Sequence, residues 1–176
     1  MKYYIEKCEQ GHLDLLVDFY EKVLAFLIST VNYPKWTVGV YPCRESIESA
    51  ISKGEQYMCL DNGRIVGAFI LNEDPQGAYK NGAWKASLKE GEYVVVHTLA
   101  VLPEDYGKGI ASFMTKYCID MARSRGFKAI RLDVVPDNFP AKKLYEKNGF
   151  SFAGDADLER GFEDIPFFSL YELNFN

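Results

Sequence analysis

The sequence predicts an α/β domain with a mixed, mostly antiparallel central sheet flanked by helices. Amphipathic helical patterns alternate along the chain with short runs that are rich in β-branched residues. The pair Asn62-Gly63 joins two of these runs and favours an antiparallel hairpin. A helical pattern lies between the runs 94–101 and 129–135, and this order is typical of two parallel strands joined by a right-handed crossover.

The first third of the chain alternates extended and helical patterns. Residues 3–7 are predicted as a strand, and residues 13–28 as an amphipathic helix because apolar residues recur there at helical spacing. An aromatic, proline-containing loop is expected over residues 32–42. A second helix follows over about residues 44–53 and ends at Gly54.

A hairpin and a long loop follow. Strands are predicted over residues 56–61 and 64–71, on either side of the Asn62-Gly63 turn. Residues 72–91 lack periodicity, contain three glycines and are long for a connection inside a compact domain. We expect a functional loop there, leaning over the active site.

The second half of the chain continues the alternation of helices and strands. The predicted segments in order are a strand at 94–101, a helix at 110–125 capped by Gly126, a strand at 129–135, a short helix from Pro140 to the cap at Gly149, and strands at 150–153 and 167–175 separated by a loop at 154–166. No repeat or linker interrupts this order, so one domain is expected over residues 1–176.

Composition limits the classes of function. The net charge of -5 argues against a nucleic-acid partner, which would require clustered Lys and Arg. The four cysteines are scattered without metal-ligand spacing, so neither a metal site nor a disulfide framework is expected. The start of the chain has charge within six residues, and no apolar run reaches the length of a membrane span. A cytoplasmic protein without a membrane partner is expected, and a homodimer is left open.

A glycine turn between a strand and a helix indicates an anion site. Gly107 and Gly109 follow the strand 94–101 and precede the helix 110–125. Without side chains they allow backbone N–H groups to approach a ligand, and the positive end of the helix faces the same point. A phosphate group suits such a site, although many turns require glycine only for its backbone conformation.

A second motif changes the balance between these two interpretations. Residues 138–150 read N-F-P-A-K-K-L-Y-E-K-N-G-F and predict a short helix that leads into a strand. Together with residues 94–111, this segment resembles the GCN5-related N-acetyltransferase (GNAT) family. Its N-x-x-A-x-x-L-Y-x-x-x-G-F pattern matches at every named position. In the glycine loop, Tyr106 stands where the family commonly has Arg or Gln.

The resemblance implies acetyl-CoA as the cofactor, bound by the backbone of the strand and by the glycine loop. The cofactor-binding residues that it implies are Leu99, Ala100, Val101, Tyr106, Gly107, Lys108, Gly109, Ile110, Ala111, Asn138, Ala141 and Tyr145. Tyr145 occupies the position of the tyrosine that protonates the departing CoA thiolate in many members. Its alternative role is core packing.

His97 is the candidate general base. Two residues before Leu99, it is expected to point to the same face of the sheet, and aralkylamine acetyltransferases resemble this strand in carrying a histidine nearby. A reference pKa of ~6.5 would let the imidazole accept a proton near neutral pH. A structural strand histidine, Glu92 or Glu73 as the base, and deprotonation by bulk water remain alternatives.

The acceptor site is expected, by elimination and family analogy, among aromatic residues and the loop 154–166. The aromatic candidates are Tyr33, Trp36, Tyr41 and Trp84. Aromatic rings could hold an aralkyl group or a cation, but they could equally belong to the core. The loop carries five acidic residues and only one basic residue, Arg160, so it would attract an amine or simply be a solvated acidic loop.

Two functions follow from these observations. The first is an N-acetyltransferase that moves the acetyl group of acetyl-CoA directly to a primary amine of a small molecule or a protein through a ternary complex. The alternative is a non-catalytic acyl-CoA-binding sensor or interaction module. The pair Tyr145 and His97 favours the enzyme, whereas Tyr106 leaves room for the sensor.

Overall fold

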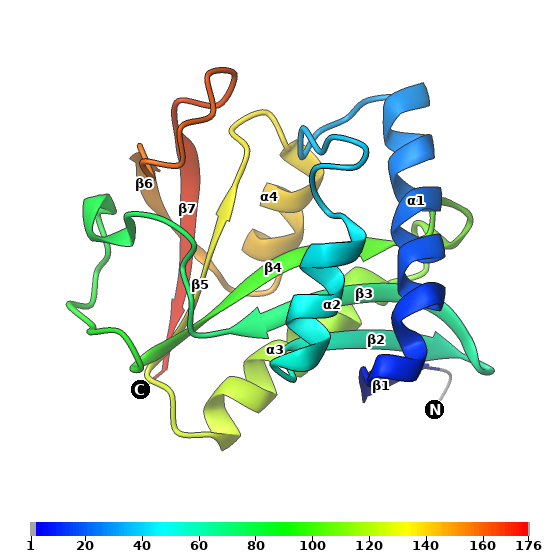
Figure 1. Cartoon of the computed structure of the whole chain (residues 1–176). Coiled ribbons are helices and arrows are strands. Elements are labelled where there is room, and N and C mark those ends of the chain that lie inside the picture. Colours follow the sequence, from blue (N-terminus) through cyan, green and yellow to red (C-terminus); the bar gives the residue numbers. More distant parts are fainter. Residues whose placement is uncertain (1–2, 176) are drawn as a thin grey trace. The chain divides into compact units, whose positions relative to one another are not determined.

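The computed structural model describes residues 3–175, and its elements are drawn in Figure 1. Within these residues the strands are β1 (Tyr3–Lys7), β2 (Gln56–Asp61), β3 (Arg64–Asn72), β4 (Tyr93–Val101), β5 (Ala129–Val134), β6 (Ser151–Ala156) and β7 (Phe168–Asn174). The α-helices are α1 (Leu13–Ser29), α2 (Arg44–Ser52), α3 (Ile110–Ser124) and α4 (Phe139–Lys147). Three short 3-10 turns lie at Gln10–His12, Tyr79–Asn81 and Pro103–Asp105.

The described strands form one mixed sheet in the order β1-β2-β3-β4-β5-β7-β6. The β4–β5 pair is parallel, whereas β1–β2, β2–β3, β5–β7 and β6–β7 are antiparallel. The parallel register places Tyr93 opposite Ala129 and Val95 opposite Arg131. The predicted fold class and the parallel strand pair around α3 are therefore confirmed.

The chain divides into two compact units, and β4 and α3 contribute residues to both. The first unit comprises residues 3–71 and 97–117, and the second comprises residues 72–96 and 118–175.

The first unit contains the hairpin of β2 and β3 together with β1, and α1 and α2 pack against each other within it (Figure 1). The hairpin turn has positive φ at both central residues, 51° at Asn62 and 80° at Gly63, as the Asn-Gly pair predicts. The buried side of α1 contributes six residues to the core of this unit. The core residues of the unit include Leu13, Leu16, Phe19, Tyr20, Val23, Leu27, Ile47, Ile51, Met58, Leu60 and Ala68.

The second unit has its own core, to which β4, β5, β6 and β7 contribute buried side chains. Its buried members include Tyr79, Tyr93, Val95, Ala129, Ala153, Leu158, Phe168 and Leu170, and Trp84 packs against them. The predicted boundary between β6 and its following loop is wrong, because β6 continues to Ala156. Asp155 therefore belongs to the strand, where its carboxylate accepts a hydrogen bond of 2.6 Å from the Ser169 hydroxyl.

Three of the four cysteines are buried as free thiols among apolar side chains. Burial raises the pKa of Cys8 and of Cys59 to about 12, with smaller contributions from Glu6 and Asp61 respectively. Burial also raises the pKa of Cys118 on α3. These cysteines thus behave as small apolar side chains.

Candidate functional site

The second half of β4 carries a local change of backbone conformation. Thr98 has a φ of +48°, which is uncommon for a β-branched residue. This φ interrupts the regular extended backbone between His97 and Leu99, and the expectation that their side chains share one face of the strand stays a prediction. His97 is 9% exposed, and Leu99 is half-buried.

Tyr20 supports the unusual backbone at Thr98. From α1, its hydroxyl donates a hydrogen bond of 3.1 Å to the carbonyl of Thr98. The ring is fully buried, and burial raises the pKa of the phenol, so the group remains a donor over the physiological pH range. The sequence pattern placed Tyr20 correctly on the buried side of α1 but gave no signal for this partner 78 residues away.

The glycine loop after β4 has the geometry that the sequence predicted. Leu102 donates its N–H to the carbonyl of Val66 at 3.0 Å and so ties the start of the loop to β3. Gly107 and Gly109 have φ values of +76° and +81°, and α3 begins at the next residue, Ile110. A Cβ atom added at either glycine would meet nothing within 4 Å. The backbone conformation therefore requires glycine, and the space beside both residues is open to a ligand.

Asp105 anchors this loop through two cations. Its carboxylate is 2% exposed, accepts hydrogen bonds from Arg64 Nη2 at 3.0 Å and Lys108 Nζ at 2.7 Å, and has Arg64 Nη1 2.8 Å from its other oxygen. The hydrogen bond from Arg64 is the largest cause that holds the pKa of Asp105 below its usual range. The sequence gave no signal for the pairing with Arg64, since 41 residues separate the two.

Tyr106 replaces the Arg or Gln that is common at this position with an aromatic contact. Its ring lies 5.6 Å from that of Phe26 on α1, at an interplanar angle of 82°. Partial burial raises the pKa of its phenol. Tyr106 thus contacts α1 by edge-to-face packing.

The second predicted motif lies in the second unit. The side chain of Asn138 accepts the N–H of Ala141 at 3.2 Å and caps α4, and Gly149 has a φ of +91° after the helix. Tyr145 is buried with its ring 5.4 Å from that of Phe150. Burial is the main cause that raises the pKa of Tyr145, so its hydroxyl keeps its proton at neutral pH.

The predicted acceptor aromatics are distributed over both units. Trp36 is half-buried, with its ring 6.2 Å from that of Tyr20, while Tyr33 and Tyr41 are half-buried in the same connection between α1 and α2. Trp84 belongs to the second unit, where the guanidinium of Arg131 lies 4.2 Å from its ring centroid. Trp36 and Trp84 both pack against core clusters, in agreement with the alternative interpretation of these residues.

The two glutamates considered as alternative bases have partners of their own. Glu92 accepts hydrogen bonds from the ammonium of Lys128 and the N–H of Lys89, and these hold its pKa below the usual range. Glu73 lies 3.7 Å from Arg125. A lowered pKa makes Glu92 a weaker proton acceptor.

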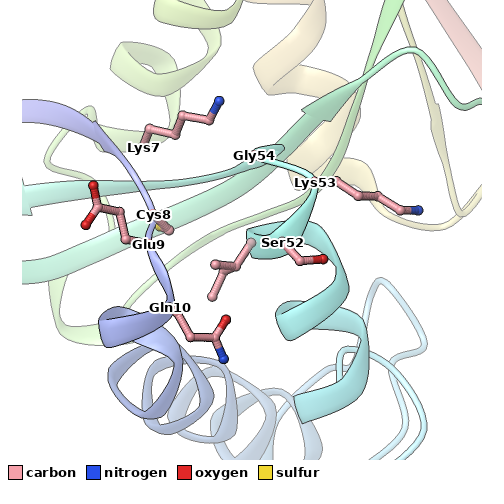
Figure 2. Close-up of a pocket in the computed structure, with 8 residues that line it drawn as sticks. Lys7, Cys8, Glu9, Gln10, Ser52, Lys53 and Gly54 are labelled. Carbon is pink, nitrogen blue, oxygen red and sulfur yellow. The ribbon is translucent and has the colours of Figure 1, made fainter.

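Figure 2 shows an open hollow where the end of β1 approaches the end of α2. It contains none of the residues predicted from the motifs. Its lining residues are Lys7, Cys8, Glu9, Gln10, Ile51, Ser52, Lys53 and Gly54. Within residues 3–175, no group of three or more His, Cys, Asp or Glu side chains could hold a metal ion. None of the helices described is long and apolar enough to cross a membrane.

Comparisons with known proteins agree with this geometry. The model of the acetyltransferase (GNAT) family matches residues 25–150, and the chain belongs to this family. N-alpha-acetyltransferase 30 of Schizosaccharomyces pombe is 33% identical over 95 residues, which are 53% of this chain and 55% of that protein. Streptothricin acetyltransferase of Escherichia coli is 31% identical over 127 residues, which are 72% of this chain and 66% of that protein. The matches thus span between about half and two thirds of these relatives.

A solved structure extends the likeness over nearly the whole chain. The GNAT-family acetyltransferase of Streptococcus agalactiae superposes with a TM-score of 0.80 at 17% identity, covering 99% of this chain and 96% of that one. At this identity the likeness concerns the fold, which is the fold class that the sequence predicted.

Proposed function

We propose that the protein is an N-acetyltransferase that moves the acetyl group of acetyl-CoA directly to a primary amine through a ternary complex. The observation that carries this proposal is the loop after β4, where Gly107 and Gly109 combine positive φ with open space at the start of α3. Backbone N–H groups at such a point suit the pyrophosphate of CoA. Membership of the acetyltransferase family supports the same donor.

The proposed reaction forms an amide bond and breaks a thioester bond. Acetyl-CoA supplies the activated carbonyl, and main-chain groups of Leu99, Ala100 and Val101 would hold and polarise it. The proton that leaves the amine passes to His97, directly or through water. Tyr145 gives its proton to the sulfur of the departing CoA; burial raises its pKa, so the phenol carries that proton before the step.

The acceptor belongs to one of two classes of primary amine. The relatives include an enzyme named N-alpha-acetyltransferase 30 and an enzyme named streptothricin acetyltransferase. The half-buried aromatic residues Tyr33, Trp36 and Tyr41 could contact either acceptor, as could Trp84 in the second unit. The assignment of each of these residues to the acceptor rests on the family analogy.

The test measures the release of free CoA from acetyl-CoA over a panel of amines, with acetylated products identified by mass spectrometry. The panel contains spermidine, tryptamine, streptothricin and a pentapeptide with a free N-terminus. Acetylation of at least one amine, absent when the protein is omitted, is the expected result. If the protein binds acetyl-CoA in calorimetry but acetylates none of them, the sensor hypothesis replaces the enzyme.

A further inference from the structure

The guanidinium of Arg160 lies at the centre of a hydrogen-bonded cluster in the second unit. Its two terminal nitrogens donate to the two carboxylate oxygens of Asp133, each at 2.8 Å. The same side chain donates to the carbonyls of Gln76 and Pro75, and its Cζ lies 4.7 Å from the ring centroid of Phe168. Because the planar guanidinium of Arg160 donates to four acceptor atoms, the side chain is held in one orientation.

Asp133 extends this cluster to a predicted acceptor residue. The hydroxyl of Tyr79 donates to Asp133 at 2.8 Å, and the indole N–H of Trp84 donates to the carbonyl of Tyr79. Burial, followed by the charge of Asp133, raises the pKa of Tyr79 well above its ordinary value, so the hydroxyl remains a donor. Arg160, Asp133, Tyr79 and Trp84 thus form one continuous chain of contacts.

The two connections that carry Arg160 and Tyr79 also touch directly. The N–H of Ala78 donates to the carbonyl of Leu158 at 2.9 Å. Gly77 has a φ of +154°, and a Cβ there would lie 2.8 Å from that carbonyl and 3.0 Å from Nε of Arg160. The connection before β4 and the connection before β7 are therefore held together without room for a larger residue at Gly77.

We propose that Arg160 is a positioning residue for the amine acceptor, acting through Asp133 and Tyr79 on Trp84. The proposal rests on the acetyltransferase function above and on the expectation that Trp84 and the loop 154–166, which precedes β7, belong to the acceptor site. Arg160 does not touch the reacting atoms. It fixes the two connections in one arrangement, so an acceptor meets a preformed wall and loses less affinity to the ordering of loops.

The primary test is the variant Arg160→Met, which keeps the length of the side chain and removes its donors. We expect the KM of Arg160→Met for the amine that the parent acetylates fastest to rise on the order of tenfold. The reason is that the variant loses binding energy shared by the ground state and the transition state. The KM for acetyl-CoA should stay within about twofold of the parent. Arg160→Lys restores the charge without the fork and should give an intermediate acceptor KM.

Arg44→Met is the matched control, because Arg44 also pairs with a carboxylate, Asp14 at 2.6 Å, on the exposed surface of the first unit. It changes the net charge equally and should leave both KM values unaltered. Hydrogen exchange gives a readout that does not depend on turnover. The amides of residues 75–82 should exchange faster in Arg160→Met and in Arg160→Lys than in the parent, and at the parent rate in Arg44→Met.

Two results would overturn the inference, and they differ from failure of the proposed function. One is a folded Arg160→Met enzyme with the parent's acceptor KM. The other is an equal rise of the KM for the acceptor and the KM for acetyl-CoA, which would show that Arg160 only stabilises the fold. If Arg160→Met does not fold, the same two measurements are made on Arg160→Lys. A parent protein that binds acetyl-CoA but acetylates no amine would instead remove the proposed function, and the inference with it.

Discussion

The ammonium of Lys108 lies 2.7 Å from a carboxylate oxygen of Asp105, so the positive charge of Lys108 in the glycine loop is paired within the protein. Arg64 contacts the same carboxylate at 2.8 Å. If Lys108 turned toward a phosphate of the proposed cofactor, Arg64 would keep the buried carboxylate of Asp105 paired. The first prediction follows from this arrangement.

Replacing Asp105 with Asn should destabilise the protein by about 1–2 kcal/mol at neutral pH, since two cations lose their buried partner. The folded-state pKa of Asp105 is lowered, so the pairing stabilises the fold fully above the unfolded-state pKa of ~3.9. This contribution is lost as the pH falls through the lower folded-state pKa. Urea unfolding at several pH values should therefore show a difference from the parent that shrinks on acidification.

Asp18→Asn serves as the control for this prediction, because Asp18 forms an exposed pair with Lys22 at 2.7 Å on α1. Its removal should cost less than about 0.5 kcal/mol. An Asp105→Asn protein as stable at pH 7 as the Asp18→Asn protein would contradict the anchoring role of Asp105.

Replacing Gly109 with Asp should weaken CoA binding strongly while the protein stays folded. The positive φ is unfavourable for Asp, and its carboxylate would occupy the open space assigned to the pyrophosphate. Gly39→Asp is the control, because Gly39 also has a positive φ, +70°, and open surroundings. The substitution therefore strains the backbone in the same way outside the glycine loop. Calorimetry with CoA decides, and equal affinity in both variants would show that the pyrophosphate assignment is wrong.

Replacing Tyr145 with Phe should lower kcat by the ~10²–10⁴ typical of a positioned acid. The ring and its packing against Phe150 remain, so the melting temperature and the affinity for CoA should barely change. Rapid-quench and steady-state rates measure the effect. An unimpaired Tyr145→Phe enzyme would remove Tyr145 from the chemistry and leave it as a core residue.

Replacing His97 with Ala should produce a defect that shrinks as the pH rises, because hydroxide or an already neutral amine can replace a lost base. The acidic limb of the kcat/KM profile should disappear in the variant. The measurement is a pair of pH profiles with one acceptor. The same acidic limb in both enzymes would eliminate His97 as the base and leave Glu92, Glu73 or water in that role.

Replacing Trp36 with Ala should raise the acceptor KM and leave the affinity for CoA unchanged. Because Trp36 also packs near Tyr20, thermal melting must accompany the kinetics. If the affinities for acceptor and CoA both fall together with the melting temperature, Trp36 acts only through the core of the first unit.

The local features of the fold could be predicted from the sequence because each depends on neighbours in the chain. Asn62-Gly63 determines its own turn, and Gly107 and Gly109 determine the conformation of the loop before α3. The positive φ at Thr98 could not be predicted, since a β-branched residue in an apolar run indicates ordinary extended backbone.

The electrostatic contacts of the site could not be predicted for a different reason. Arg160 pairs with Asp133, which is 27 residues away, although eight acidic residues, five of them within residues 154–166, lie nearer in the sequence. Which of several acidic residues an arginine meets depends on the packing of whole strands, and charge spacing carries no information about it. The pairing of Arg64 with Asp105 was missed on the same grounds.

The buried thiols have a practical consequence for assays of CoA release with disulfide dyes. Such reagents react with thiolates, and the raised pKa values of Cys8, Cys59 and Cys118 keep these three groups protonated at neutral pH. Only Cys43, which is half-buried at the start of α2, is accessible in the native protein. We expect native protein to consume at most about one equivalent of dye before acetyl-CoA is added, so CoA release can be followed continuously without blocking the protein.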